Sequence, residues 1–116
     1  MSRDQIMYLQ DIAESCQKIL RFTDGLTQSD LIRDEKTYDA VVRNLEIIGE
    51  AAKHISDELR KQLTGIEWRK IAGMRDMLAH AYFGIDNDIL WDVVQNKIPR
   101  LAKSVAKYLD SHFHSN

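Results

Sequence analysis

Turn-forming residues are scarce in this chain of 116 residues, which contains five glycines and one proline. A β-sandwich needs a turn every ~8–12 residues, so this scarcity excludes an all-β fold. Apolar runs are also short, and none approaches the ~18 residues that a membrane-spanning helix requires. Apolar residues nevertheless make up 44% of the chain and charged residues 29%, as in folded globular domains. We therefore predict one all-α domain over residues 1–116, with no membrane segment.

Cysteine is nearly absent as well. Cys16 alone cannot form an internal disulfide framework. Because it lies among Ile12, Ile19 and Leu20, we interpret it as a buried structural thiol rather than a reactive one. The first residues include an acidic side chain and no continuous apolar segment, so no signal peptide is expected. These observations predict a cytoplasmic protein.

A strong excess of positive charge is also missing, since the net charge is −2. This balance argues against a strongly basic nucleic-acid binder. The charge is unevenly distributed: residues 1–60 contain 8 Lys/Arg and 12 Asp/Glu, whereas residues 61–116 contain 8 and 6. We expect any polyanionic partner to prefer the second half of the chain.

Apolar residues recur at helical spacing in four long segments. The predicted long helices cover about 2–23, 37–55, 66–82 and 88–112, with a turn of helix from Ser29 and a short helix from Ser56 to Leu63 between them. Gly49 lies inside the second long helix, where it costs about 1 kcal/mol relative to alanine. Close approach of another helix is the usual compensation, and we predict it here. Pro99 interrupts the last helix, where it predicts a kink.

One face of the third predicted helix gathers residues that suit chemistry on a phosphate. At about 100° per residue, Arg75, Asp76, His80 and Tyr82 share an arc opposite an apolar stripe. The stripe consists of Ile71, Met74, Met77, Leu78 and Ala81, and the small residues of the arc are Ala72 and Ala79. Arginine presents a planar charged fork to phosphate, and histidine takes or gives a proton near neutral pH. Asp76 precedes His80 by one helical turn and is expected to orient its ring.

No Gly-rich phosphate loop, acidic pair or spaced set of metal ligands accompanies this arc. A metal-free reaction on a phosphodiester therefore suits it best, and we expect no metal and no cofactor. The outer face of a helix can also carry an arginine and a histidine without catalysis. The residues alone leave open a non-catalytic module that binds RNA or nucleotide phosphate, and a purely structural dimerisation domain.

The segment 75–82, Arg-Asp-Met-Leu-Ala-His-Ala-Tyr, resembles the R-x-x-x-x-H-x-Y motif of the HEPN superfamily, specifically of its HepT-like family. Residues 44–52 and 66–74 are also similar to this family, as is the last helix with Trp91 and Ile98-Pro99. The resemblance covers essentially the whole chain, and the motif shows no departure from the family pattern.

This resemblance implies a bundle of four to five helices that forms a homodimer. It implies the toxin of a type VII-like toxin–antitoxin pair, an endoribonuclease that cleaves RNA without metal. Arg75 and His80 would be catalytic and Asp76 supporting. The implied partner is a minimal nucleotidyltransferase antitoxin, which transfers AMP to Tyr82 and silences the toxin. A two-fold dimer would also bring two copies of His80 and Arg75 to one cleft, as acid–base cleavage of RNA requires.

Other residues are candidates for contact with RNA or a partner. One face of the last helix is basic, and it consists of Lys97, Arg100, Lys103 and Lys107. This face predicts an RNA track or a docking surface for an acidic antitoxin, with an ordinary solvated face as the alternative. Trp68 lies at the edge of the arc, where it would stack on a base or pack against a neighbouring helix or dimer partner.

Overall fold

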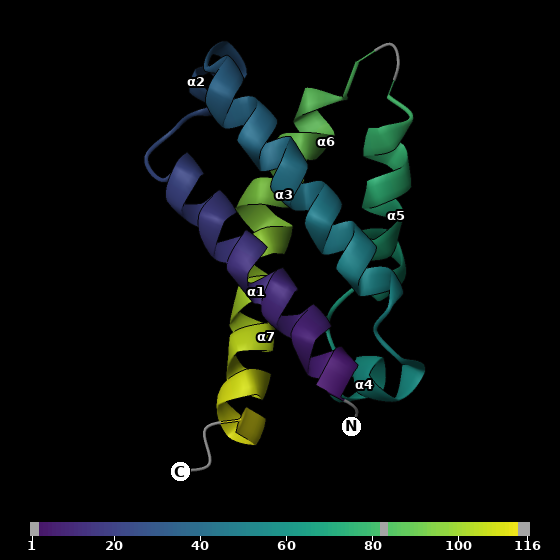
Figure 1. Ribbon diagram of the computed structural model, residues 1–116. Helices are drawn as coiled ribbons and strands as arrows, with labels where there is room; N and C mark the ends of the chain where they lie inside the picture. The colour runs from purple at the N-terminus through teal and green to yellow at the C-terminus, as the bar shows by residue number, and fades with distance from the viewer. Residues whose placement is uncertain (1–2, 82–83, 114–116) are drawn as a thin grey trace.

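The computed structural model describes residues 3–81 and 84–113, and within them it contains helices and turns but no strand (Figure 1). The prediction of an all-α fold is confirmed. None of the described helices is both long and apolar enough to cross a membrane. The elements are α1 (Arg3–Thr23), α2 (Gln28–Arg33), α3 (Glu35–Lys53), α4 (Asp57–Gln62), α5 (Trp68–Ala79), α6 (Asn87–Asp92), the π-helical segment η1 (Val93–Lys97) and α7 (Ile98–Phe113).

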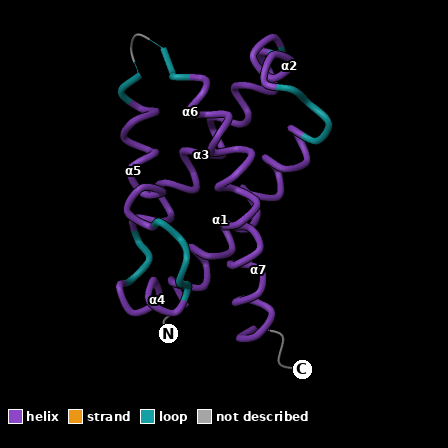
Figure 2. The backbone as a smooth tube through the Cα atoms, turned by 180° about the vertical axis from the view of Figure 1, so that it is seen from behind, coloured by secondary structure: helices purple, strands orange, loops and turns teal. Residues whose placement is uncertain are grey.

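The long helices form a bundle whose neighbours run in opposite directions (Figure 1, Figure 2). Helix α1 lies between α7 and α3, and α5 packs on the other side of α3. The run α6–η1–α7 is continuous, and α7 packs against α1. Among the described residues, the backbones of α5 and α7 do not approach each other as closely as these neighbouring pairs do. The bundle is therefore tightly packed along the three seams between α1 and α3, α3 and α5, and α1 and α7. The fourth seam, between α5 and α7, is looser.

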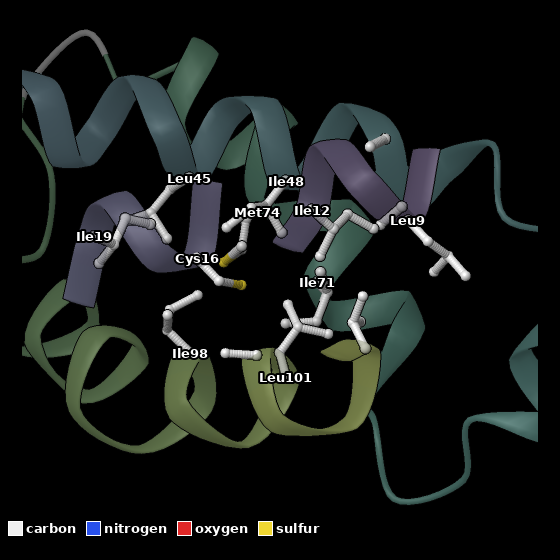
Figure 3. Packing of buried hydrophobic residues seen from close by; sticks show 14 of the residues in the cluster. Leu9, Ile12, Cys16, Ile19, Leu45, Ile48, Ile71, Met74, Ile98 and Leu101 are labelled. Atoms are coloured by element: carbon white, nitrogen blue, oxygen red, sulfur yellow. The ribbon is translucent and has the colours of Figure 1, made fainter. Parts of the chain in front are cut away.

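Apolar side chains from the four long helices meet in one core (Figure 3). Its labelled members are Leu9, Ile12, Cys16 and Ile19 of α1, Leu45 and Ile48 of α3, Ile71 and Met74 of α5, and Ile98 and Leu101 of α7. Each fully buried Leu or Ile side chain contributes about 1.5–3 kcal/mol. Burial raises the pKa of the Cys16 thiol to about 12, so the thiol is neutral at physiological pH. The interpretation of Cys16 as a structural thiol is confirmed.

Side-chain caps set helix starts that differ by a residue or two from the predicted ones. The predicted start at Ser29 is wrong because Thr27 caps α2. Its hydroxyl accepts the Asp30 N–H while the Asp30 carboxylate accepts the Thr27 N–H. Likewise, Asp34 caps α3 by accepting the N–H of Thr37, so the helix begins at Glu35. It ends at Lys53 rather than near residue 55.

The discontinuity predicted at Pro99 takes the form of a π-helical turn. Proline has no N–H, and its ring clashes with the carbonyl four residues earlier, here that of Gln95. The chain widens in η1, where the Ile98 N–H donates to the carbonyl of Val93. Such π turns within α-helices are often found at functional sites.

Candidate active site

Helix α5 carries the predicted site and is held against α3 at Gly49. A Cβ atom at this position would lie 2.8 Å from the Arg75 backbone nitrogen and 3.2 Å from the Ile71 carbonyl oxygen. No side chain fits such a gap, so glycine permits the contact between the two helices. The predicted close approach is confirmed, and it places the Arg75 backbone directly on α3.

The Arg75 side chain reaches over α3 and contacts two carboxylates. Its Nε lies 3.3 Å from Glu50 Oε1, and its Nη1 lies 3.5 Å from Asp76 Oδ1. The guanidinium lines a pocket of about 320 Å³ between α1, α3 and α5. Because the side chain is exposed and both contacts are long, its hydrogen-bond donors can turn to an incoming phosphate.

The Asp76 carboxylate contacts both cations of the site, Arg75 and Lys53. Its Oδ1 accepts a hydrogen bond of 3.0 Å from Lys53 Nζ of α3. Lys53, with a smaller contribution from Arg75, holds the pKa of the Asp76 carboxyl below its usual value. The carboxylate therefore stays ionised at neutral pH, where it positions the two cations and has no proton to donate.

His80 lies at the end of α5, which stops at Ala79. The prediction that this helix runs to about residue 82 is wrong for residues 80 and 81. The His80 N–H is shared between the carbonyls of Asp76 and Leu78, which tightens the last turn. The ring Nδ1 lies 2.8 Å from the Asp76 carbonyl oxygen. Since a carbonyl only accepts, Nδ1 carries the proton and Nε2 has the lone pair in the neutral ring.

Asp76 thus orients His80, as predicted, but the observed contact is made by its main-chain carbonyl while its carboxylate holds Lys53. Tyr82 lies outside the described residues, so its place on the Arg75 face stays a prediction. In the apolar stripe, Ile71, Met74 and Leu78 are buried as predicted. Met77 was expected in the core and is exposed instead.

The remaining candidates separate into one buried and several surface residues. Trp68 is buried, and its Nε1 donates a hydrogen bond of 3.3 Å to the Leu63 carbonyl. Trp68 therefore packs within the chain and exposes little of its ring, while its contact with RNA or a partner stays a prediction. Lys97 pairs with Glu67 at 2.7 Å. The exposed members of the basic face are Arg100, Lys103 and Lys107. Contact of this face with RNA or a partner stays a prediction.

Two residues of the site were missed in the sequence, Glu50 and Lys53 of α3. The signal was present, since they flank the helix surface around Gly49, for which a close helix contact was predicted. Across residues 3–81 and 84–113, no group of three His, Cys, Asp or Glu side chains is arranged to hold a metal ion. The site offers two cations, two carboxylates and an imidazole at the junction of α3 and α5.

Comparison with known proteins gives a consistent result. A family model described as ribonuclease HepT-like matches residues 12–108. A protein of Thermococcus cleftensis named "Probable ribonuclease HepT" is 46% identical over 101 residues, covering 87% of this chain and 92% of that protein. A provisionally named RNase of Caldanaerobacter subterraneus is 39% identical over 88% of this chain and 91% of its own length. Another provisionally named RNase, from Methanocaldococcus jannaschii, is 37% identical over 92% of this chain and 88% of its own length. No solved structure matches the chain.

Proposed function

Because the chain belongs to the ribonuclease HepT-like family, we propose that it is an endoribonuclease that cleaves RNA without a metal ion. Arg75 and His80 are its catalytic residues, and Asp76 supports both. The observation that carries this proposal is that Asp76 contacts the Arg75 guanidinium with its side chain and the His80 ring with its carbonyl. One residue thereby holds a fixed cation and a proton carrier at the end of the same helix.

The reaction follows from these groups. Nε2 of His80 takes the proton of the RNA 2′-hydroxyl while the 2′-oxygen forms a bond to phosphorus. The bond between phosphorus and the 5′-oxygen breaks, and the leaving oxygen takes a proton from a general acid. The products are a 2′,3′-cyclic phosphate and a 5′-hydroxyl. Arg75 stabilises the negative charge that grows on the phosphate oxygens in the transition state.

A homodimer supplies the second proton carrier. One chain offers one His80 to the site, and the reaction needs a base and an acid. A two-fold axis beside the end of α5 would bring the second His80 and Arg75 to the same phosphate. The exposure of Arg75, Asp76 and His80 in the single chain supports this arrangement.

The activity is that of the toxin in a type VII-like toxin–antitoxin pair, with a minimal nucleotidyltransferase as the antitoxin. In the silencing step, the Tyr82 oxygen attacks the α-phosphorus of ATP, pyrophosphate leaves, and the phenol proton passes to a base. The attached AMP brings a negative charge to a position two residues after His80. Tethering raises its effective concentration near Arg75 to the millimolar range, so it competes with RNA for the guanidinium.

A direct assay tests the ribonuclease activity. We expect the purified chain to cleave single-stranded RNA in the presence of EDTA and to leave DNA of the same sequence intact, because DNA lacks the 2′-hydroxyl. Gel analysis should show fragments that end in a 2′,3′-cyclic phosphate. Loss of cleavage in EDTA would contradict the metal-free reaction. RNA binding without cleavage would assign the chain to the non-catalytic alternative.

Tyr82→Phe should abolish silencing. The substitution removes the acceptor oxygen and nearly preserves the shape of the side chain. After incubation with the nucleotidyltransferase and ATP, intact-mass spectrometry should show added AMP on the wild type and none on Tyr82→Phe. Tyr38→Phe serves as the control and should still accept AMP. An equal adduct on wild type and Tyr82→Phe would show that the acceptor lies elsewhere.

A further inference from the structure

An apolar groove opens on the side of α5 that faces away from Arg75. It has a volume of about 480 Å³ and lies between α5 and the α6–η1–α7 run. Met74 and Met77 line it on α5, and Ile89, Val93 and Leu101 line it on the other side. The groove follows the looser seam between α5 and α7. This seam stays open because α5 packs mainly on α3 and α7 packs mainly on α1.

The groove leaves large apolar side chains in water. Met77 is 45% exposed and Ile89 is 49% exposed, and both line the same groove from different helices. Clustered apolar exposure of this kind marks interaction sites on folded proteins. Methionine adapts its shape to a partner, since its side chain is unbranched and flexible. The π-helical turn lies in the same wall, to which it contributes Val93 and Lys97.

The rim of the groove favours an acidic partner. Lys70, Lys97 and Arg100 line it together with Glu67 and Asp92. Both lysines already pair with Glu67, at 3.1 Å and 2.7 Å. Arg100 forms no ion pair in the described part of the chain. The same holds, within those residues, for Lys103 and Lys107, which extend the positive surface along α7. Complementary charge across an interface favours association, so these cations can pair with carboxylates on a partner.

We propose that this groove binds an acidic amphipathic helix of a partner protein. The apolar side chains of such a helix, spaced i, i+3, i+4 and i+7, would cover Met77 and Ile89 and close the open seam. Its carboxylates would pair with Arg100 and the lysines beyond it. RNA fits less well, because no aromatic side chain lines the groove for base stacking. A second copy joined at the Arg75 face would leave the groove open, because Arg75 points to the other side of α5.

The probe for this proposal is a fluorescent synthetic peptide with leucine at i, i+3, i+4 and i+7 and glutamate elsewhere. Fluorescence anisotropy with the full chain at low salt should show saturable binding in the micromolar range. Met77→Glu and Ile89→Glu should each weaken binding at least tenfold, because each places a carboxylate against the acidic peptide. Arg100→Glu should also weaken it. A peptide with lysine in place of glutamate should bind at least tenfold more weakly.

Matched controls come from the other exposed apolar residues. Ile32 is 43% exposed and Met7 is 52% exposed, and neither lines the groove. Ile32→Glu and Met7→Glu should bind the peptide like the wild type, and melting curves should show that all variants fold. The proposal is overturned if the acidic peptide does not bind, or if Met77→Glu and Ile89→Glu match these controls. It is also overturned if they change only the sedimentation of the dimer or the binding of RNA.

Discussion

His80→Ala should slow RNA cleavage by about 10²–10⁴-fold, the usual effect of removing a general acid–base group. The fold should persist, because His80 is exposed and lies beyond the last residue of α5. The Asp76 carbonyl still receives the main-chain N–H of residue 80 when the ring is removed. Initial rates on labelled RNA in EDTA, together with circular dichroism, measure both effects. Arg75→Ala should lose a comparable part of the rate, because phosphate loses its fixed cation.

The chain offers a matched control for this experiment. The ring of His112 on α7 lies 2.9 Å from the Tyr108 carbonyl, the same contact with a residue four positions earlier that His80 makes. His112→Ala should therefore remove an equivalent hydrogen bond and leave cleavage unchanged. If His80→Ala cleaved RNA at the wild-type rate, the assignment of His80 as the proton carrier would be wrong.

Gly49→Val should destabilise the protein and lower its activity together. The added Cβ would lie 2.8 Å from the Arg75 backbone nitrogen and 2.9 Å from the Arg75 Cβ, so α3 and α5 must separate. Overpacking of this kind costs about 1–3 kcal/mol, and valine recovers little of it through helix propensity. Each kcal/mol lowers the melting temperature of a domain of this size by about 4 °C. Because Arg75 itself is displaced, cleavage should fall even at temperatures where the variant is folded.

Gly73→Ala is the control for this substitution. Gly73 lies inside α5, and apart from its chain neighbours and the backbone of its own helix no heavy atom comes within 4 Å of a Cβ built there. Alanine should therefore raise stability by up to about 1 kcal/mol through helix propensity. Thermal unfolding followed by circular dichroism compares the two variants. A melting temperature for Gly49→Val equal to that of the wild type would show that the helices adjust without strain.

The periodicity of apolar residues predicted those features of the fold that depend on the local sequence. The long helices, the buried thiol of Cys16 and the tight contact at Gly49 follow from the spacing of apolar and small residues. The end of α5 could not be predicted this way, because the nearest strong stop signal is Gly84. The helix ends earlier, where the His80 N–H and ring both turn back to the Asp76 carbonyl. A helical wheel shows only the angular positions of side chains, so it cannot predict these hydrogen bonds at the end of the helix.

The contacts between helices also could not be predicted from the sequence. The wheel places Met77 beside buried residues, but its exposure depends on the looser seam between α5 and α7. The pairing of Glu50 with Arg75 and of Lys53 with Asp76 depends on the register of α3 against α5. A single sequence shows which face of each helix is apolar. It does not show how far one helix is shifted along another.

The contact between the His80 ring and the Asp76 main chain has a consequence for how this site tolerates sequence variation. Every residue type has a carbonyl, so many side chains at position 76 would keep the ring in place, at the cost of the pairing with Lys53. A single inserted or deleted residue between positions 76 and 80 would remove the carbonyl from reach of the ring. The orientation of this histidine therefore depends on the number of residues in the turn and only weakly on their identity. The R-x-x-x-x-H part of the motif fits this requirement, because it fixes Arg75 and His80 and allows any residue at the four positions between them.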